Sequence, residues 1–416
     1  FYDFKEIEER VILIGVQTEQ DEDVAASLDE LEELAATAGA VTVGKVIQNR
    51  EAVHPGTYIG KGKIEEVAAL LAAYDANGVI CDDELSPAQM NNLERELDCK
   101  VMDRTLLILD IFAGRAVSSE GKIQVELAQL RYRAARLVGL RESLSRLGGG
   151  IGTRGPGEKK LETDRRLIRT RISALKAELA QVEKHRELIR GKRSRGNLKT
   201  AAIVGYTNAG KSTLLNTLTG AGILAEDKLF ATLDPTTRVL ELKDGQQILL
   251  TDTVGFIRKL PHHLVEAFKS TLEEAKYADY IIHVVDASNP QAELQMFTVY
   301  ETLRELGATG KKIVTLLNKQ DQVTGSGIRD LKADYTVKCS ARTGEGLDEF
   351  KDVLAKLLAE DQIYLEELYP YSEAGKIQKI REFGTLLSEE YREDGIFVKA
   401  RVPAEIFVSV MPKSHK

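Results

Sequence analysis

Gly205-Tyr206-Thr207-Asn208-Ala209-Gly210-Lys211-Ser212 is the stretch that decides the fold of this chain. It fits the phosphate-binding pattern of a glycine, four residues of any type, and Gly-Lys-Ser. An apolar run, Ala201 to Val204, comes before it, and a helical pattern, Ser212 to Leu218, comes after it. A strand, a glycine-rich turn and a helix are the context that this motif requires. We therefore predict a phosphate-binding loop, with an ordinary glycine turn at a helix start as the alternative.

The chemistry of such a loop assigns roles to its residues. Its backbone N–H groups can wrap a phosphate, and the positive end of the following helix points at the same place. Lys211 is predicted to reach the β- and γ-phosphates, which makes it a candidate catalytic residue, and the Ser212 hydroxyl is predicted to ligate Mg²⁺. Every residue from Gly205 to Ser212 is therefore a candidate for nucleotide binding.

The composition describes a folded chain of several domains. For 416 residues we expect about three domains. The chain is 43% hydrophobic and 29% charged, which is typical of a globular protein. The sequence shows no apolar run of the roughly 18 residues that span a bilayer and no signal-peptide pattern. The missing initiator methionine leads us to expect a trimmed or partial chain, and the three cysteines are expected to be reduced thiols of a cytosolic protein.

The net charge of −8 is spread very unevenly along the chain. Between Lys122 and Lys199 there are 21 lysines and arginines against 8 aspartates and glutamates, a net charge of +13. The rest of the chain has 36 basic and 57 acidic residues, a net charge of −21. A basic segment on an acidic body indicates polyanion binding, and this contrast favours nucleic acid over the alternative of a solvated helical face.

Residues 1–104 are predicted to form a small α/β domain. The expected strands and helices are, in chain order, Val11–Val16, Val24–Ala38, Val41–Ile47, Lys63–Tyr74, Gly78–Cys81, a helix capped by Ser86 with Pro87 at its first position, and Lys100–Asp103. This alternation argues for a parallel sheet covered by helices. The turn Gly60-Lys61-Gly62-Lys63 is either a second anion site at a helix start or an ordinary turn.

Residues 105–196 are predicted to form a long basic helical hairpin. Apolar residues recur at three- and four-residue spacing over Lys122–Leu140 and over Leu161–Ile189, which is typical of two amphipathic helices that pack antiparallel. The tip loop between them, Gly148–Glu158, has six glycines in eleven residues, and Gly191–Asn197 reads as a linker. A glycine loop lets a backbone approach a ligand, and basic residues beside it can bind phosphates. A plain flexible connector is the alternative. The candidates for RNA contact are Arg146, Gly149, Gly150, Arg154, Lys159 and Lys160.

Residues 197–358 again alternate strands and helices. The strand Gln247–Leu250 runs into Thr251-Asp252-Thr253-Val254-Gly255, and an acidic residue at such a strand end can hold Mg²⁺ through water. Tyr280–Val285 is a buried strand. Two further strands follow, and they are Lys312–Leu317, ending at Asn318-Lys319-Gln320-Asp321, and Tyr335–Lys338, ending at Cys339-Ser340-Ala341.

Residues 359–416 are predicted to form a small α+β domain. A helix is expected at Ser372–Phe383, and Thr385–Arg392 is expected to pair with Ile396–Val402 across an Asp-Gly turn. Ala404–Val410 is expected to be a closing helix. The residues of this domain do not suggest a catalytic role.

The motifs of the third domain resemble those of the small GTP-binding domains, in their usual order. In that family the Asn-Lys-x-Asp string reads the base. By this resemblance Asp321 accepts hydrogen bonds from the ring N–H and 2-amino groups of guanine, which adenine lacks, so adenine would leave a carboxylate unpaired. Lys319 lies along the base, Asn318 braces the loop, and Ser340 and Ala341 offer backbone N–H groups to guanine O6. The resemblance implies GTP as the substrate and Mg²⁺ as the cofactor.

The same resemblance implies two switch segments. The first gives a threonine to Mg²⁺ and the γ-phosphate, with Thr232, Thr236 and Thr237 as candidates. Similarity to GTPases with a Phe-x-Thr-Leu-x-Pro string selects Thr232 as ligand and catalytic residue. In the first segment the residues expected at the nucleotide are Phe230, Ala231, Thr232, Leu233 and Asp234. In the second they are Asp252, Thr253, Val254 and Gly255. Of these, Asp252 is expected to bind Mg²⁺ through water, and Gly255 is a candidate catalytic residue.

Two residues give the site its own character. Many GTPases have a glutamine after Asp-x-x-Gly that orients the attacking water, but Phe256 stands there and cannot hydrogen-bond water. Hydrolysis is therefore expected to be slow, or to rely on another group, an ion or a partner. Asn208, a candidate catalytic residue, stands in a loop form that includes GTPases which use K⁺ beside the phosphates. The alternative is that Asn208 only braces the loop.

The order of parts resembles the HflX family of ribosome-associated GTPases over nearly the whole chain. The stretches that carry the resemblance are Gly60–Lys63, Gly148–Glu158, Gly205–Ser212, Phe230–Asp234, Asp252–Gly255 and Asn318–Asp321. It implies a cytoplasmic GTPase that binds the large ribosomal subunit and its rRNA. GTP would then act as a switch, and the protein would dissociate or rescue stalled ribosomes under stress. We expect a monomer, with no membrane span and no DNA partner.

Two other functions remain open at this point. One is a GTPase of tRNA modification, as other proteins with the Asn208 form are, although the sequence shows no partner cysteine or folate-like site. The other is a structural RNA-binding protein whose G domain senses nucleotide but hydrolyses it poorly, which Phe256 permits.

Overall fold

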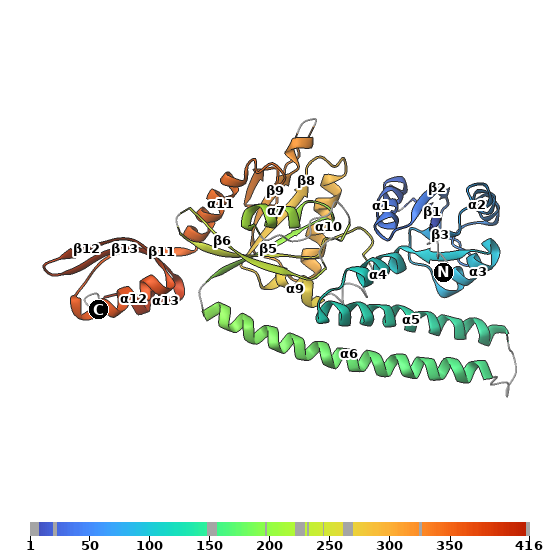
Figure 1. The fold of residues 1–416 in the computed structure, drawn as a ribbon, viewed down its shortest axis with the longest axis horizontal. Coiled ribbons are helices and arrows are strands. Elements are labelled where there is room, and N and C mark those ends of the chain that lie inside the picture. Colours follow the sequence, from blue (N-terminus) through green and yellow to red (C-terminus); the bar gives the residue numbers. More distant parts are fainter. Residues whose placement is uncertain are drawn as a thin grey trace, which may run out of the picture.

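The structure is a computed structural model that describes residues 8–19, 23–147, 156–195, 198–220, 229–230, 233–243, 245–260, 269–323 and 327–412. Three sheets follow one another along the chain. A long pair of helices comes between the first and the second in sequence order, and Figure 1 shows it running beneath both of these units. The predicted α/β fold class is confirmed, because the first two sheets are mostly parallel and their strands alternate with helices. Among the described helices, none is both long and apolar enough to cross a membrane.

The N-terminal unit is a four-stranded parallel sheet in the order β2-β1-β3-β4. Its strands and helices are β1 (Arg10–Gln17), α1 (Val24–Thr37), β2 (Val41–Asn49), α2 (Lys61–Ala73), β3 (Gly78–Cys81), α3 (Pro87–Leu97), β4 (Lys100–Asp103) and α4 (Arg104–Arg115). Alternate residues of β1 face opposite sides. Leu13 packs in one core with α1 and α4, and Ile12 packs in another with α2 and α3. Ser86 and Gln89 form a capping box at α3, which confirms the predicted helix start.

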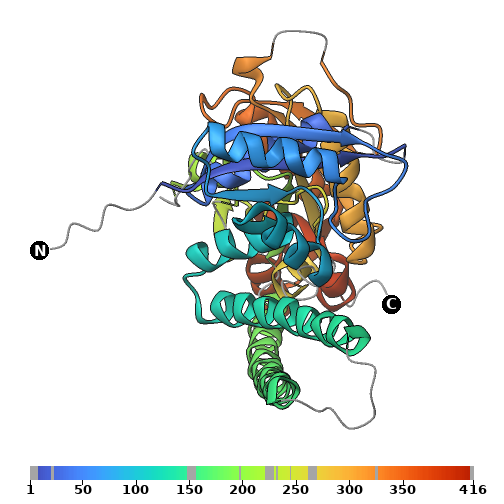
Figure 2. The ribbon, with the colours of Figure 1, turned by 90° about the vertical axis from the view of Figure 1, so that its right-hand side faces the viewer.

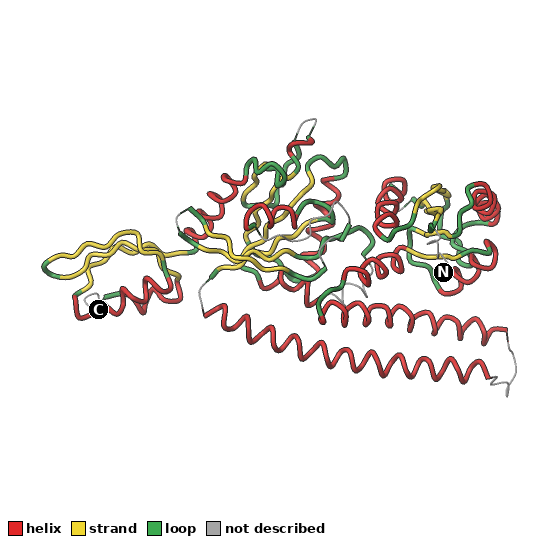
Figure 3. The backbone as a smooth tube through the Cα atoms, in the orientation of Figure 1, coloured by secondary structure: helices red, strands yellow, loops and turns green. Residues whose placement is uncertain are grey.

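The hairpin consists of α5 (Ser119–Leu147) and α6 (Pro156–Arg195), which lie side by side (Figure 3). An apolar seam joins the two helices, and its buried residues are Ile123, Leu127, Leu175 and Leu179. The middle of α5 also binds the N-terminal unit, because Tyr132 and Arg136 both contact Asp103, at 2.9 and 2.7 Å. Figure 2 shows α5 below the N-terminal unit, where it packs against α3 and α4 rather than against the sheet.

Both ends of α6 extend further than the apolar periodicity indicated. Pro156, Gly157 and Glu158, expected in the tip loop, form the first turn of α6. Proline is tolerated there because its missing N–H would have no partner within the helix. Gly191 to Arg195, expected as a linker, continue α6, since lysine and arginine are good helix formers and are favourable at a helix C-terminus. Residues 148–155 and 196–197 lie outside the described part of the chain.

The central unit is a six-stranded sheet in the order β10-β9-β8-β5-β7-β6, parallel except for β6. Its elements are β5 (Lys199–Gly205), α7 (Lys211–Thr219), β6 (Thr236–Glu241), β7 (Gln247–Asp252), α9 (Lys269–Tyr277), β8 (Tyr280–Asp286), α10 (Ala292–Glu305), β9 (Lys312–Asn318), the 3₁₀ turn η1 (Gln320–Gln322), β10 (Tyr335–Lys338) and α11 (Leu347–Glu360). Strand β6 was not predicted, because it is an edge strand with a single buried residue, Leu240. Thr236 and Thr237, which the sequence offered as switch residues, pair with β7 in this strand.

The C-terminal unit is an antiparallel sheet in the order β11-β13-β12 with short helices on one side (Figure 1). Its elements are β11 (Gln362–Tyr369), the 3₁₀ turn η2 (Tyr371–Glu373), α12 (Ala374–Phe383), β12 (Thr385–Arg392), β13 (Gly395–Pro403) and α13 (Ala404–Val410). The predicted strand pair and closing helix are confirmed. Strand β11 was missed, because its glutamates face solvent and only Leu365 and Tyr369 are buried.

Candidate nucleotide-binding site

The phosphate loop joins β5 to α7, as the motif requires. Two of its glycines allow close approach by other backbone and side-chain atoms. Gly210 has a φ of +96°, and a Cβ there would lie 2.3 Å from the Asn318 amide nitrogen. A Cβ on Gly205 would lie 2.3 Å from the carbonyl oxygen of Val284. Both positions therefore exclude a side chain, and the loop lies tightly against the ends of β8 and β9.

Lys211, the first residue of α7, is buried beneath this loop. Its Nζ donates to the carbonyl oxygens of Tyr206 and Gly205, at 2.8 and 3.2 Å. Burial lowers the pKa of Lys211 to about 8, although the Asp252 carboxylate acts in the opposite direction. The ammonium group thus lies within the loop, at the place where the sequence predicted phosphate contact.

Ser212 and Asp252 meet beside the loop, from the start of α7 and the end of β7. The Ser212 hydroxyl donates to Asp252 Oδ2 at 2.7 Å, and Asp252 is fully buried. Hydroxyl and carboxylate oxygens are the hard ligands that Mg²⁺ prefers, so these two residues fit the predicted metal site. Thr232, the third predicted ligand, lies outside the described residues.

The segment after β7 runs along the phosphate loop. Thr253 and Val254 are buried. A Cβ on Gly255 would lie 2.8 Å from Thr207 Cα and 3.0 Å from Lys211 Nζ, so a side chain at this position would collide with the loop. The predicted catalytic pair Lys211 and Gly255 is therefore brought together.

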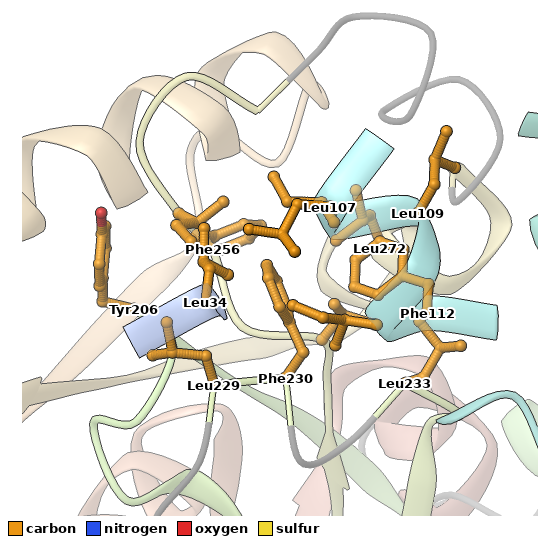
Figure 4. Close-up of a cluster of buried hydrophobic side chains, with 14 of the residues drawn as sticks. Leu34, Leu107, Leu109, Phe112, Tyr206, Leu229, Phe230, Leu233, Phe256 and Leu272 are labelled. Carbon is orange, nitrogen blue, oxygen red and sulfur yellow. The ribbon is translucent and has the colours of Figure 1, made fainter. Parts of the chain in front are cut away.

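Phe256 takes part in this contact through its backbone alone. Its N–H donates to Gly205 O at 3.1 Å, and its carbonyl oxygen accepts from the Thr207 N–H at 2.8 Å. The side chain is 1% exposed and points into an apolar core that the central and N-terminal units share (Figure 4). In place of a glutamine that orients water, this site therefore has a core residue without a polar group.

The predicted base-reading residues come from neighbouring strand ends. Asn318, at the end of β9, donates to Ala209 O and accepts from the Ala341 N–H, both at 2.8 Å. It ties the phosphate loop to the loop after β10. Lys319 follows it and pairs with Asp286, at the end of β8, at 2.7 Å. The bracing role that the resemblance implied for Asn318 thus has a contact on each side.

Asp321 presents an exposed carboxylate on η1. A hydrogen bond from Ser340 lowers the pKa of Asp321, so the carboxylate is ionised at neutral pH. The two N–H groups that the resemblance assigned to guanine O6 are engaged within the protein. Ser340 donates to Glu345 O at 3.0 Å, and Ala341 donates to Asn318. The Ala341 N–H can therefore bind a base only if it shares its hydrogen bond to Asn318 or gives that bond up.

The first switch segment is described in part. The Phe230 N–H donates to Thr207 Oγ1 at 2.9 Å, which places this backbone beside the phosphate loop. The side chains of Phe230 and Leu233 lie in the shared core, and Asp234 contacts the start of α5 (Figure 4). Leu233 and Asp234, expected at the nucleotide, are thus directed elsewhere in this structure, and Ala231 lies outside the described residues.

The predicted RNA contacts fall where the structure describes no side chains. Arg146 lies in the last turn of α5, and Lys159 and Lys160 lie near the start of α6. The other candidates lie outside the described residues, and they are Gly149, Gly150 and Arg154. All six stay predictions.

The second anion-site candidate, Gly60–Lys63, forms the start of α2. The Gly60 N–H donates to Gln48 Oε1 at 2.8 Å, and Lys63 pairs with Glu66 at 2.7 Å. The protein itself engages both of these groups, which favours the ordinary turn over an anion site.

A buried ionic cluster joins the N-terminal unit to the segment after β7, and the sequence did not predict it. Arg104 is 1% exposed and pairs with Glu30 at 2.6 Å and with Asp82 at 3.3 Å. It also donates to the carbonyl oxygen of Arg258 at 3.3 Å. Lys259 pairs with Asp82 at 2.6 Å. The N-terminal unit thus holds the residues that follow the phosphate-loop contact.

Tyr206 of the phosphate loop belongs to this cluster as well. Its hydroxyl donates to Glu30 and accepts from the Arg258 N–H at 2.8 Å. Burial raises the pKa of Glu30, against the opposing effect of Arg104. Burial also acts to raise the pKa of Asp82, but its two paired cations outweigh this and lower it. No local pattern could reveal these contacts, since some partners are 177 residues apart.

Comparison with known proteins identifies the family. The chain matches the families described as GTP-binding GTPase N-terminal over residues 25–113, GTP-binding GTPase Middle Region over residues 115–193, and 50S ribosome-binding GTPase over residues 200–319. It is 68% identical to the GTPase HflX of Lacrimispora saccharolytica, over 98% of this chain and 97% of that protein. It is 49% identical to the GTPase HflX of Caldanaerobacter subterraneus subsp. tengcongensis, over 96% of this chain and 92% of that protein. The chain therefore belongs to the HflX family of P-loop GTPases and hydrolyses GTP to GDP and phosphate.

Proposed function

We propose that this GTPase binds the large ribosomal subunit through its basic hairpin, and that GTP binding and hydrolysis switch this binding to dissociate or rescue stalled ribosomes under stress. Such a protein acts in the cytoplasm, on the ribosome. Residues 200–319 match a family described as 50S ribosome-binding GTPases, which supports this partner. The net charge of +13 between Lys122 and Lys199 supports an RNA surface. The observation that carries the proposal is an arginine-lined groove on α6.

This groove has a volume of about 560 Å³. Its described lining residues are Glu162, Arg165, Arg166, Arg169, Thr170 and Ser173. Within the described ranges, Arg165, Arg166 and Arg169 form no ion pair. By contrast, Arg171 pairs with Glu126 of α5 through two hydrogen bonds of 2.7 and 2.8 Å. Guanidinium groups that are not neutralised can bind phosphates in bidentate geometry, so the groove fits the backbone of ribosomal RNA.

The triple variant Arg165→Gln, Arg166→Gln, Arg169→Gln should bind large subunits at least about tenfold more weakly at moderate salt. The reason is that the variant lacks three cations that pair with phosphates, and it therefore also loses the counterion release that accompanies this pairing. Its salt dependence should also be shallower, by about one unit of slope for each phosphate that is no longer neutralised. The measurement is sedimentation of the full chain with purified large subunits at several salt concentrations, with a non-hydrolysable GTP analogue or with GDP.

Arg171→Gln is the matched control, because it makes the same change on the same helix at an arginine that Glu126 already neutralises. It should keep the salt slope of the wild type. An equal loss in both variants, or no loss in the triple variant, would count against the groove as the RNA site. Equal sedimentation with the GTP analogue and GDP would count against the switch, as would a nucleotide response that survives Lys211→Ala.

The phosphate loop accounts for the chemistry that this function needs. Lys211 lies where it can neutralise charge that develops on the transferred phosphoryl group. Gly255 lies directly beside it, so its N–H can bind the γ-phosphate. Mg²⁺, when bound by Ser212 and through water by Asp252, neutralises phosphate charge. Because Phe256 cannot orient water, we propose that hydrolysis is slow in the free protein and is stimulated by the ribosome.

We further propose that K⁺ takes part in hydrolysis at Asn208. The Asn208 side chain is partly exposed and forms no hydrogen bond with the residues that the structure describes, which favours a cation ligand over a brace. Replacing K⁺ by Na⁺ at constant ionic strength should slow GTP turnover by about tenfold or more, because the site loses a charge that stabilises the transition state. In Asn208→Ala both salts should give the same slow rate of phosphate release. A wild-type rate that does not depend on the alkali cation would leave bracing as the role of Asn208.

A further inference from the structure

The switch segment, which we define as residues 229–235, is held at both of its described ends. At one end the Phe230 N–H donates to Thr207 Oγ1 at 2.9 Å. The Phe230 ring also packs edge-on against Phe112 of α4, with 4.7 Å between the ring centroids (Figure 4). At the other end Asp234 contacts the start of α5. The switch segment therefore bridges the phosphate loop and the base of the hairpin.

The Asp234 carboxylate receives three hydrogen bonds at the start of α5. The backbone N–H groups of Ser118 and Val117 donate to Oδ2 at 2.9 and 3.3 Å, and the Ser118 hydroxyl donates to Oδ1. Ser118 itself caps α5, because its Oγ accepts from the Gly121 N–H at 2.8 Å. A carboxylate at this end is also favoured by the helix dipole. Asp234 thus completes the end of a helix that lies 116 residues away in the sequence.

Gly121 makes room for this contact. A Cβ at Gly121 would lie 2.6 Å from Asp234 Oδ1 and 3.1 Å from Ser118 Oγ. Glycine is a poor helix former, and Gly121 lies in the first turn of α5. A side chain at this position would displace the carboxylate, so the geometry depends on the glycine.

We propose that Asp234 is a positioning residue, whose contact with α5 opposes movement of the switch segment toward Mg²⁺-bound GTP. The inference rests on the proposed role of Thr232 as a Mg²⁺ ligand. Thr232 is two residues from Asp234, and two residues of extended chain span at most about 7 Å. Movement of the switch segment toward the γ-phosphate carries Asp234 with it, and the contact with α5 resists that movement, so the contact opposes GTP binding. By linkage, bound GTP weakens the hold on the hairpin base by the same factor.

The body that this contact holds is larger than α5. Tyr132 and Arg136 bind α5 to Asp103 of the N-terminal unit, and Arg171 binds α6 to Glu126 of α5. The release of Asp234 therefore frees one attachment of the hairpin and the N-terminal unit together, while α6 stays joined by the chain to β5.

The test is a comparison of nucleotide affinities in the full chain. Asp234→Asn, Ser118→Ala and Gly121→Ala should each bind a Mg²⁺-bound, non-hydrolysable GTP analogue about fivefold more tightly or better than the wild type, the lower end of common coupling factors. Affinity for GDP should not change. Equilibrium titration with fluorescent forms of both nucleotides measures this. A purely structural defect would weaken both affinities, so the sign of the effect identifies the contact.

Matched variants make the test specific. Gly114→Ala makes the same substitution in α4, where a Cβ would meet no atom within 4 Å, and should match the wild type. Ser118→Thr keeps the hydroxyl and should also match it. Because alanine favours a helix more than glycine does, a weakened α5 cannot explain an effect of Gly121→Ala. If the ratio of the two affinities stays at the wild-type value in Asp234→Asn, Ser118→Ala and Gly121→Ala, the proposal is wrong.

Amide hydrogen exchange of residues 117–121 gives the reciprocal measurement. In the wild type this peptide should exchange faster with the GTP analogue than with GDP, and in Asp234→Asn it should exchange equally fast with both. Neither measurement includes ribosomes. If the protein does not bind ribosomes, the proposed function fails, but the result for the Asp234 contact stays valid. If Thr232→Ala binds Mg²⁺ and the analogue as the wild type does, the proposed role of Thr232 as a Mg²⁺ ligand fails. The comparison of nucleotide affinities between Gly121→Ala and Gly114→Ala still decides whether the contact opposes GTP binding.

Discussion

Arg104→Met is expected to lower the free energy of unfolding of the N-terminal unit by about 3–5 kcal/mol. Arg104 is 1% exposed, and it neutralises Glu30 and Asp82, which are themselves largely buried. Methionine keeps much of the side-chain volume but leaves both carboxylates without this cation. Asp82 keeps its pair with Lys259, but Glu30 must then be protonated, hydrated or left with an uncompensated charge.

The unfolding experiment must separate the units, because a chain of several units does not unfold in two states. Urea unfolding followed by hydrogen exchange of peptides from β1 and β3 reports on the N-terminal unit alone. Lys100→Met is the control, since Lys100 lies in the same unit and pairs with Glu9 at 3.0 Å on an exposed surface, where water screens the pair. Adding Glu30→Gln to Arg104→Met should restore part of the stability. A loss no larger than that of the control would mean that the cluster is not effectively buried.

Asp321→Asn is expected to change the preferred base of the nucleotide site from guanine to xanthine. A carboxylate accepts from both donor groups on the edge of guanine, whereas an asparagine amide offers one acceptor and one donor. Xanthine has a carbonyl oxygen where guanine has its 2-amino group, so it matches the amide. We expect the affinity for GTP to fall about a hundredfold or more, because a site built for hydrogen bonds rejects a mismatched partner strongly.

Competition between fluorescent GTP and unlabelled XTP measures this change of preference. Asp352→Asn serves as the control, because Asp352 is an exposed residue of α11 that pairs only with Lys243 among the described residues. It should leave the preference for guanine unchanged. If Asp321→Asn still prefers GTP, the base is read by other groups, and the exposed carboxylate on η1 has a different role.

Local patterns predicted the phosphate loop well, because every constraint on it is local. The turn needs glycine where a Cβ would collide, as at Gly210, and the helix begins at Lys211, one residue before the expected Ser212. The capping box of Ser86 is equally local, since both of its hydrogen bonds span three residues. Such elements can be read from the spacing of residue types.

Elements that depend on a weak or distant signal were missed or shortened. Strands β6 and β11 bury only one or two residues, so they lack the alternation that marks a strand. The ends of α6 are polar, and its apolar periodicity stops before the helix does. The expected place of Asp234 at the nucleotide differs from its observed contact at α5, because the motif places its backbone but not the direction of its side chain.

The sequence by itself determined the kind of site: a phosphate loop, a carboxylate expected to hold Mg²⁺, a string expected to read guanine, and a basic hairpin before them. Only the tertiary structure decided what surrounds that site. Tyr206 meets Glu30, and Asp234 meets Ser118, across 176 and 116 residues of sequence. Such partners are chosen by burial, which requires each buried polar group to find a hydrogen bond wherever the fold brings one within reach. That choice follows from the packing of whole units and leaves no repeat or motif along the chain.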